Sequence, residues 1–342
     1  MRFFGLVLAG LLLAALFSTT GLSGQDTWST FGSRGDGDLS RIGRDDEGDD
    51  DSSDDDDGGG RIAFARYFVT DPQLDPDAVS DGAALDRLEW QPDDAVFPGD
   101  APGSLTALYD ASLPAGLFGF RLPAALSVDD TFTAAAAFVI HSEGFSADPN
   151  GFFQISWGLW NSTATGLDRT GSFTSFAADT FELIEFDWFP NVSPFFGGPF
   201  VSPSVFGVEA GGDAFNNFSS LFGLQVSLPF DVPLLAILEH RPEVDALVLT
   251  VHRIVDSDHV VPVDAAVGVA RLDFLAARDY DVDVIGLTLW NDGFGGATPA
   301  VVATLDFHAL TAISGLPDRP EQMLRVGPAD DDDSSDDDSD DD

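Results

Sequence analysis

The strand-like segment 181–191, FELIEFDWFPN, contains the acidic pair whose spacing is best suited to chemistry. Alternate residues of a strand share a face, so Glu185 and Asp187 are expected to point the same way. The opposite side carries the apolar residues that we expect in the core: Ile184, Phe186 and Trp188. Two carboxylates at this spacing can accept hydrogen bonds from sugar hydroxyls or ligate Ca²⁺. A pair of acids on a solvated strand face is the alternative, and the residues alone leave it open.

Two tryptophans could supply an apolar platform beside these acids, because the C–H face of a pyranose packs on a flat ring. Trp160 shares its strand face with Ser156 and Gly158, and Trp290 shares its own with Thr288. Both faces are fairly polar, so these two rings are the best candidates for stacking against a sugar. Packing at a sheet edge is the competing interpretation for both rings. Trp157 and Trp188 alternate with large apolar residues, and we predict that both lie in the core.

The elements that must position these residues are strands. Runs with β-branched or aromatic character, each bounded by Asp, Asn, Gly or Pro, follow one another along the chain. The clearest are 131–141, 151–160, 181–189 and 283–290, with a hairpin formed by 234–240 and 245–254. No window predicts a long amphipathic helix, and 264–277 is the nearest candidate. This pattern predicts an all-β sandwich over residues 61–316.

The charge of the chain is extreme, with 59 acidic residues against 15 basic ones, all of them Arg. Residues 61–316 alone hold 27 Asp, 7 Glu and 9 Arg, an excess of 25 negative charges. Such a body repels itself unless salt screens it, as in salt-adapted (halophilic) proteins, although a GC-rich genome also depletes Lys. A nucleic-acid partner is disfavoured, because binding phosphates requires basic patches.

Both ends of the chain differ from this body. Residues 3–17 are apolar and follow Arg2, which predicts a signal peptide over 1–23 and a secreted or periplasmic protein; an uncleaved anchor is the alternative. We expect an acidic disordered linker over 24–60 and a disordered poly-Asp tail over 317–342. We expect these Asp runs to increase the solubility of the protein or to bind divalent cations weakly. The absence of cysteine excludes disulfides.

The order of motifs resembles the concanavalin A-like lectin/glucanase superfamily, with a distant similarity to laminarinase-like glycoside hydrolases and laminin G-like domains. The similarity is carried by GSLTALYD at 103–110, GLFGFRLP at 116–123, FELIEFDWFPN at 181–191, the hairpin 234–254 and DVDVIGLTLWNDG at 281–293. It implies a jelly-roll sandwich of two curved antiparallel sheets. The Phe-rich run 189–206 then reads as a long loop packed across the concave sheet.

The resemblance also implies what the acidic pair would do. In laminarinase-like enzymes a comparable strand carries a nucleophilic Glu, an orienting Asp and a second Glu as acid/base. Glu185 and Asp187 match the first two, but Phe189 and Pro190 stand where the second Glu belongs. We therefore expect a non-catalytic, lectin-like module that binds extracellular polysaccharide through Glu185, Asp187, Trp160 and Trp290, with Ca²⁺ as an open question. A glycan-active hydrolase or lyase with an atypical site, and a structural or surface-layer protein, are the alternatives.

Other motifs add little to this expectation. The five histidines show no metal-ligand spacing, and we expect them at the surface or at sheet edges. Asn291-Asp292-Gly293 is typical of a turn.

Overall fold

The structure is a computed structural model of the whole chain, and it describes ten ranges: 62–94, 103–146, 155–163, 182–190, 199–209, 214–217, 226–263, 268–271, 278–289 and 302–326. The predicted signal peptide, acidic linker and poly-Asp run lie outside them, as do Trp290 and 291–293. Within these ranges no helix is long and apolar enough to cross a membrane.

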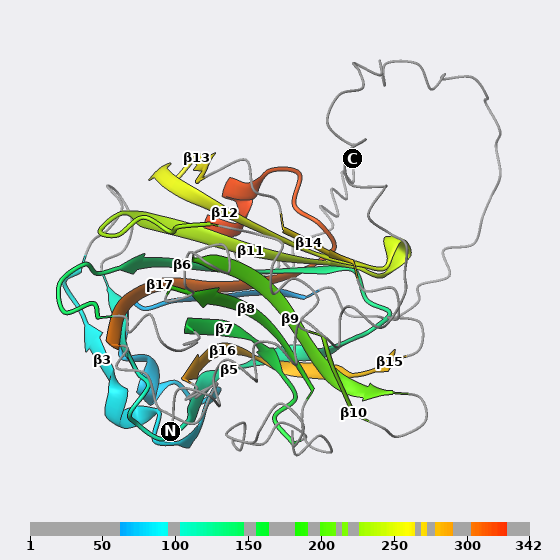
Figure 1. Ribbon diagram of the computed structural model, residues 1–342, viewed down its shortest axis with the longest axis horizontal. Coiled ribbons are helices and arrows are strands. Elements are labelled where there is room, and N and C mark those ends of the chain that lie inside the picture. The colour runs from blue at the N-terminus through cyan, green and yellow to red at the C-terminus, as the bar shows by residue number, and fades with distance from the viewer. Residues whose placement is uncertain are drawn as a thin grey trace, which may run out of the picture. The chain divides into compact units, whose positions relative to one another are not determined.

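Two antiparallel sheets form the described part of the chain, and Figure 1 shows them as two stacked layers. The nine-stranded sheet has the order β13 (His259–Pro262), β12 (Ala246–Asp256), β11 (Pro233–Arg241), β6 (Phe132–Ile140), β17 (Val302–Ser314), β4 (Ser104–Asp110) and β3 (Leu88–Gln91); β1 (Ala63–Tyr67) also pairs with β17, and β14 (Gly268–Arg271) with β12. The prediction of an all-β sandwich of two antiparallel sheets is confirmed.

The eight-stranded sheet has the order β10 (Ala214–Asn217), β9 (Phe200–Glu209), β8 (Leu183–Phe189), β7 (Ile155–Trp160), β16 (Asp281–Leu289), β5 (Gly116–Ser127) and β2 (Ala78–Gly82), and β15 (Arg278–Asp279) pairs with β9. The described helical turns are short and 3-10: η1 (Pro72–Leu74), η2 (Leu85–Arg87), η5 (Pro242–Val244) and η7 (Pro320–Leu324).

The core lies between the two sheets and is built from alternate residues of their strands. Ile184, Phe186 and Trp188 of β8 belong to it, as does Trp157 of β7, which stacks on Phe186 with ring centroids 5.9 Å apart. These four assignments confirm the predicted alternation. Apolar burial of this kind supplies most of the free energy that holds such a sandwich together.

A second apolar cluster covers the outer face of the nine-stranded sheet. It joins Ala135 and Ala137 of β6 to Met323 of η7, and the Thr311 hydroxyl donates a hydrogen bond to the Met323 carbonyl at 3.0 Å. Alanines leave room for η7, which Figure 1 shows in red-orange beside β12. The ordered chain therefore continues to Val326, ten residues beyond the predicted boundary at 316.

Two segments differ from the sequence-based prediction. The run 189–206 is not a loop throughout, because β9 begins at Phe200 and pairs with β8, with Pro203 opposite Phe186. Residues 268–271, inside the segment considered for a helix, form β14 instead.

The histidines also differ from the prediction, because three of the five are buried: His240, His252 and His308. His240 of β11 stacks on Phe132, and its Nε2 contacts the hydroxyl of Tyr280, which precedes β16 in the other sheet. Its Nδ1 lies 2.6 Å from the Asp130 carbonyl oxygen. Burial lowers the pKa of His240 below its usual value of 6.5, so the ring is neutral at pH 7 and links the sheets through hydrogen bonds.

Candidate functional site

Three neighbouring strands of the eight-stranded sheet bring the predicted acidic pair next to Trp160. In the register of β7 and β8, Glu185 lies opposite Gly158, Asp187 lies opposite Ser156, and Trp160 lies opposite Leu183. β16 continues these rows on the other side of β7, with Thr288 opposite Ser156. We call this surface, which faces away from the other sheet and carries Trp160, Glu185, Asp187, Ser156 and Thr288, the Glu185 face.

Both carboxylates of the Glu185 face are fully buried, with 0 % exposure for Glu185 and Asp187. They are therefore not acids on a solvated strand face, which was the alternative that the sequence left open. Removing a carboxylate from water costs several kcal/mol unless hydrogen bonds or opposite charges compensate it. A Val or Leu at these positions would avoid this cost, so two buried carboxylates on one strand point to a functional role.

Hydroxyl groups lie in the same row as Asp187. The side-chain oxygens of Ser156 and Thr288 are 2.5 Å apart, and the Ser156 hydroxyl lies 2.9 Å from the Thr288 carbonyl. On the core side of the sheet, the Tyr109 hydroxyl donates to the Ser156 carbonyl at 2.6 Å. Burial raises the pKa of Tyr109 well above its usual value of 10, and the negative charge of Glu185 raises it further. Tyr109 is therefore a permanent donor that fixes β7 beneath the site.

Trp160 lies against a part of the sheet that has no side chains. A Cβ atom added at Gly119 or Gly286 would come within 2.6 and 2.7 Å of Cη2 of the indole. These two glycines, on β5 and β16, therefore allow the ring to rest on the backbone of the sheet. Trp160 is only 1 % exposed and packs with Leu117, Leu183 and Val284 in a small cluster separate from the core.

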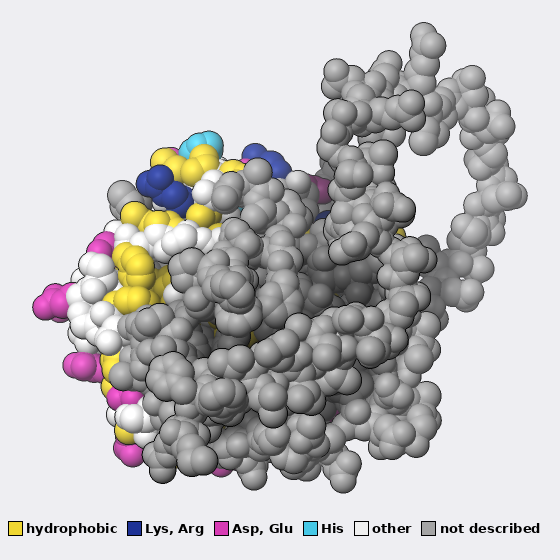
Figure 2. Space-filling model, viewed as in Figure 1, with side chains coloured by type: hydrophobic (Ala, Val, Ile, Leu, Met, Phe, Trp, Pro, Cys, Tyr) yellow, Lys and Arg dark blue, Asp and Glu magenta, His cyan; other side chains and the backbone are white. Residues whose placement is uncertain are grey.

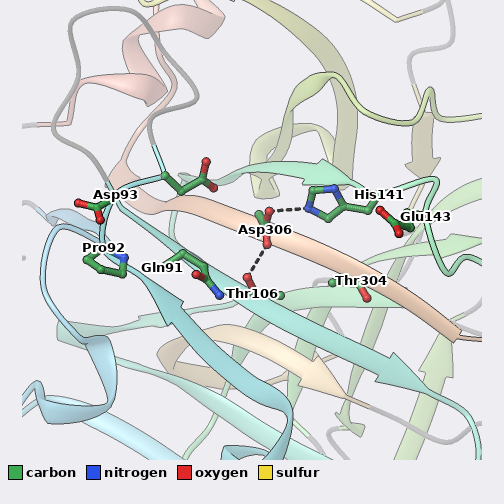
Figure 3. Close-up of a pocket in the computed structure, with 9 residues that line it drawn as sticks. Gln91, Pro92, Asp93, Thr106, His141, Glu143, Thr304 and Asp306 are labelled. Carbon is green, nitrogen blue, oxygen red and sulfur yellow. Dashed lines mark hydrogen bonds and ion pairs between the residues drawn. The ribbon is translucent and has the colours of Figure 1, made fainter.

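Sequence reasoning missed an open pocket on the outer face of the nine-stranded sheet (Figure 3). It has a volume of about 640 Å³, and we call it the acidic pocket because four carboxylates line it: Asp93, Asp94, Glu143 and Asp306. Asp306 of β17 accepts a hydrogen bond from the Thr106 hydroxyl at 2.6 Å and contacts Nε2 of His141. No spacing in the sequence signals this pocket, because its residues come from β3, β4 and β17 and from the segments that follow β3 and β6.

Neither site contains a cluster of metal ligands in the described residues: no group of three or more His, Asp or Glu side chains there could hold a metal ion. Ca²⁺ binding by Glu185 and Asp187 remains a prediction.

Comparison with known proteins finds similar folds and no sequence relatives. No family model matches the chain, and no curated protein matches it in sequence. Solved structures that resemble it include the carbohydrate recognition domain of Emp47p, with 11 % identity, a TM-score of 0.41, and coverage of 75 % of this chain and 99 % of that one. Lectin II from Ulex europaeus covers the same share, with 13 % identity, a TM-score of 0.41 and 100 % of its own chain matched.

A seed lectin of Lotus tetragonolobus gives nearly the same values, with 11 % identity, a TM-score of 0.41, and coverage of 75 % of this chain and 100 % of that one. At such scores neither a ligand nor a site is transferable, so the functional argument rests on the residues of this chain.

Proposed function

We propose that this protein is an exported, non-catalytic carbohydrate-binding module whose site is the Glu185 face. The observation that supports it is the convergence of two buried carboxylates, two hydroxyls and one indole on adjacent strands β8, β7 and β16. Trp290, the residue after β16, belongs to the proposed site but lies outside the described residues. Signal-directed export, and cation binding by the Asp runs, belong to the same proposal and rest on the sequence alone.

Each group has a role in binding a sugar. Glu185 and Asp187 accept hydrogen bonds from sugar hydroxyls, and charge-assisted bonds of this kind are about twice as strong as neutral ones. The Trp160 indole offers the apolar surface against which a pyranose ring packs. Because these side chains are buried, binding requires that the ligand gain access to them, which makes accessibility part of the test.

Hydrolysis is disfavoured by Phe189, the residue that follows Asp187 on this side of β8. Leu183, Glu185, Asp187 and Phe189 alternate with the core residues, so Phe189 occupies the place where a retaining enzyme would carry its acid/base carboxyl. The phenyl ring is buried and has no proton to donate. Retaining hydrolysis needs two carboxyl groups about 5–5.5 Å apart, one of them protonated. This strand supplies a binding pair rather than that arrangement.

A glycan array in concentrated salt, with and without Ca²⁺, tests the proposal and identifies the sugar. Calorimetry with the strongest neutral binder should then show that Glu185→Gln and Asp187→Asn each lower the affinity by about tenfold, the value of one charge-assisted hydrogen bond. Trp160→Leu should lower it by a similar factor. Glu89→Gln, at an exposed acid on β3, is the matched control and should bind as the wild type does.

No binding by the wild type to any glycan, at either Ca²⁺ concentration, would leave the structural role as the better account. An affinity that survives all three substitutions would show that sugar binds elsewhere on the molecule.

A further inference from the structure

A second pocket, of about 620 Å³, lies where the edge strand β1 of the nine-stranded sheet approaches β5 of the other sheet. Two arginines line it, Arg66 of β1 and Arg121 of β5, with Asp77 as its one acidic residue. We call it the arginine pocket. Its remaining walls are mostly apolar and include Tyr67, Pro123 and Val326.

Arg66 is held in place by both charge and ring contacts. Its Nε and Nη2 lie 2.9 Å from the carboxylates of Asp75 and Asp77, and its guanidinium carbon lies 4.9 Å from the centre of the Phe64 ring. A hydrogen bond from Nη1 to the Ala65 carbonyl oxygen, at 3.3 Å, adds to these contacts. Arg66 therefore contributes a fixed positive charge to the pocket.

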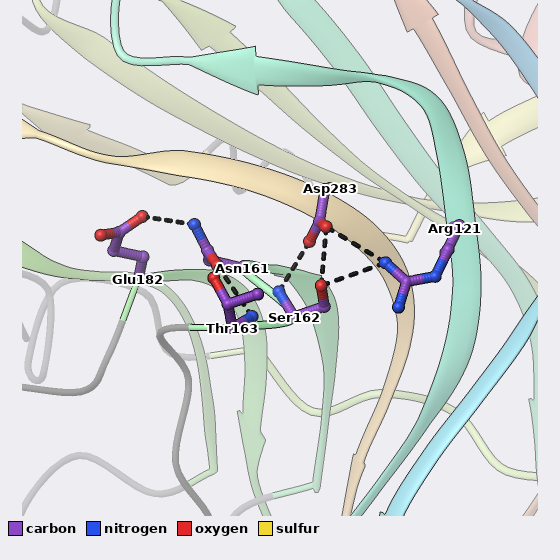
Figure 4. A network of polar contacts seen from close by, with 6 residues as sticks. All are labelled: Arg121, Asn161, Ser162, Thr163, Glu182 and Asp283. Atoms are coloured by element: carbon purple, nitrogen blue, oxygen red, sulfur yellow. Dashed lines mark hydrogen bonds and ion pairs between the residues drawn. The ribbon is translucent and has the colours of Figure 1, made fainter.

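Arg121 is different, because most of its donors are unused. It alternates with the core residues Phe120 and Leu122, and its side chain is 56 % exposed. Figure 4 shows its guanidinium directed toward Ser162 and Asp283. Nη1 lies 3.2 Å from the Ser162 hydroxyl and 3.5 Å from an Asp283 oxygen, and within the described ranges Nε and Nη2 make no polar contact. The planar guanidinium is thus oriented by its contacts with Ser162 and Asp283 and keeps one edge for a ligand. An arginine edge matches the two oxygens of a carboxylate.

Aromatic surface lies in the same pocket. Tyr67 is 38 % exposed, and its hydroxyl oxygen lies 3.0 Å from the Leu324 carbonyl oxygen and 3.3 Å from that of Val326, so its one proton is shared between them or donated to either, which fixes the ring's orientation. A fixed ring beside a guanidinium suits a ligand with an apolar C–H face and an anionic group. Acidic sugars combine these two features.

We propose that the arginine pocket binds the carboxylate of an acidic saccharide, with Arg121 as the residue that contacts it and Tyr67 as the surface that packs on the sugar ring. The pocket shares no lining residue with the Glu185 face, although Arg121 lies in one row of the sheet with Val284 and Trp160, and the inference does not depend on binding at Glu185 and Asp187. The chain itself contains another source of carboxylate within reach of the pocket. The chain continues from Val326 through three uncharged residues to Asp330–Asp333, and four residues span at most about 14 Å.

The direct test is a titration with trigalacturonate and with its carboxyl-reduced, neutral counterpart, at one fixed salt concentration. We expect the wild type to prefer the acidic sugar and Arg121→Gln to lose about tenfold or more of that affinity, because a bidentate contact is removed. Arg121→Lys should fall between the two, since it keeps the charge without the planar edge. Arg253→Gln, at an exposed arginine on β12, is the control for a general loss of positive charge and should leave the affinity unchanged.

A chain that lacks 330–342, together with a peptide of that sequence, separates the two sources of carboxylate. Tighter trigalacturonate binding by the shortened chain, with Arg121-dependent binding of the peptide, would support the pocket and identify the tail as a competitor for it. Unchanged affinity would support the saccharide as its sole ligand. No measurable binding of trigalacturonate, or equal losses in Arg121→Gln and Arg253→Gln, would overturn the proposal. A failure of the Glu185 face would appear with neutral glycans instead, so the two outcomes are distinguishable.

Discussion

The acidic pocket and the arginine pocket have nearly the same volume, about 640 and 620 Å³, but opposite charge. The first is lined by four carboxylates and no arginine, a balance of signs that follows the 34 acids and 9 arginines of the body. The second has two arginines and one carboxylate, against the composition of the chain. A pocket whose charge has the same sign as the whole body carries little information about function. A pocket of the opposite sign requires a specific cause.

The acidic pocket fits a general role of acidic residues on this surface. The described acids in Figure 2 project around the margin of the view, and basic side chains appear in two separate places at its top. Carboxylates spread in this way bind water and ions without selecting a ligand. The arginine pocket is the better candidate for recognition.

The largest effect that we expect is on the whole body and concerns salt. Its excess of 25 negative charges repels itself, and the Debye length falls from about 10 Å at 0.1 M to about 3 Å at 1 M salt. We expect the melting temperature to rise by on the order of 10 °C between these concentrations, equivalent to about 3–5 kcal/mol for a domain of this size. Calorimetric melts in NaCl measure it. A melting temperature that does not change with NaCl would mean that the negative charges are already neutralised in low salt. The comparison between the two pockets would then no longer hold.

A smaller effect concerns pH. Burial lowers the pKa of His240, His252 and His308 below 6.5 in the folded state, so the unfolded chain binds protons first as the pH falls. Stability should therefore be independent of these groups above pH 7 and should fall from about pH 6.5 downward, by up to about 1.4 kcal/mol per pH unit for each histidine. His240→Gln should reduce this slope, as chemical denaturation at pH 7, 6 and 5 would show. An identical slope in the variant would exclude His240 as a contributor.

The smallest effects compare the two pockets directly. In low salt, Asp93→Asn should raise the melting temperature because it removes one charge from a crowd of like charges. Arg121→Gln should lower it because it removes a compensating one. Each change should stay below about 1 kcal/mol, since both groups are at the surface, and should vanish in 1 M NaCl. Shifts of the same sign for both variants would contradict the electrostatic account.

Local sequence patterns predict part of this molecule and not the rest. The alternation around Glu185 placed Trp188 in the core correctly, because strand geometry depends on neighbours two residues apart. The arginine pocket was not predictable, because Arg66 and Arg121 belong to different sheets and only the folded chain brings them together. The strand β9 was missed because Pro203 reads as a loop signal unless its partner strand is known. The burial of His240 likewise depends on Tyr280, 40 residues away.

The central claim is that the Glu185 face binds sugar without cleaving it, and one experiment measures both properties in the same samples. Wild type and Glu185→Gln are each incubated with β-glucan to measure hydrolysis, and are each titrated with the strongest neutral ligand from the array. General acid–base catalysis is worth about 10²–10⁴-fold, so a face with Phe189 in place of the proton donor should show no turnover. The account predicts no hydrolysis by either protein and an affinity about tenfold lower in Glu185→Gln. Robust hydrolysis by the wild type that Glu185→Gln abolishes would contradict it and require a proton donor from another strand.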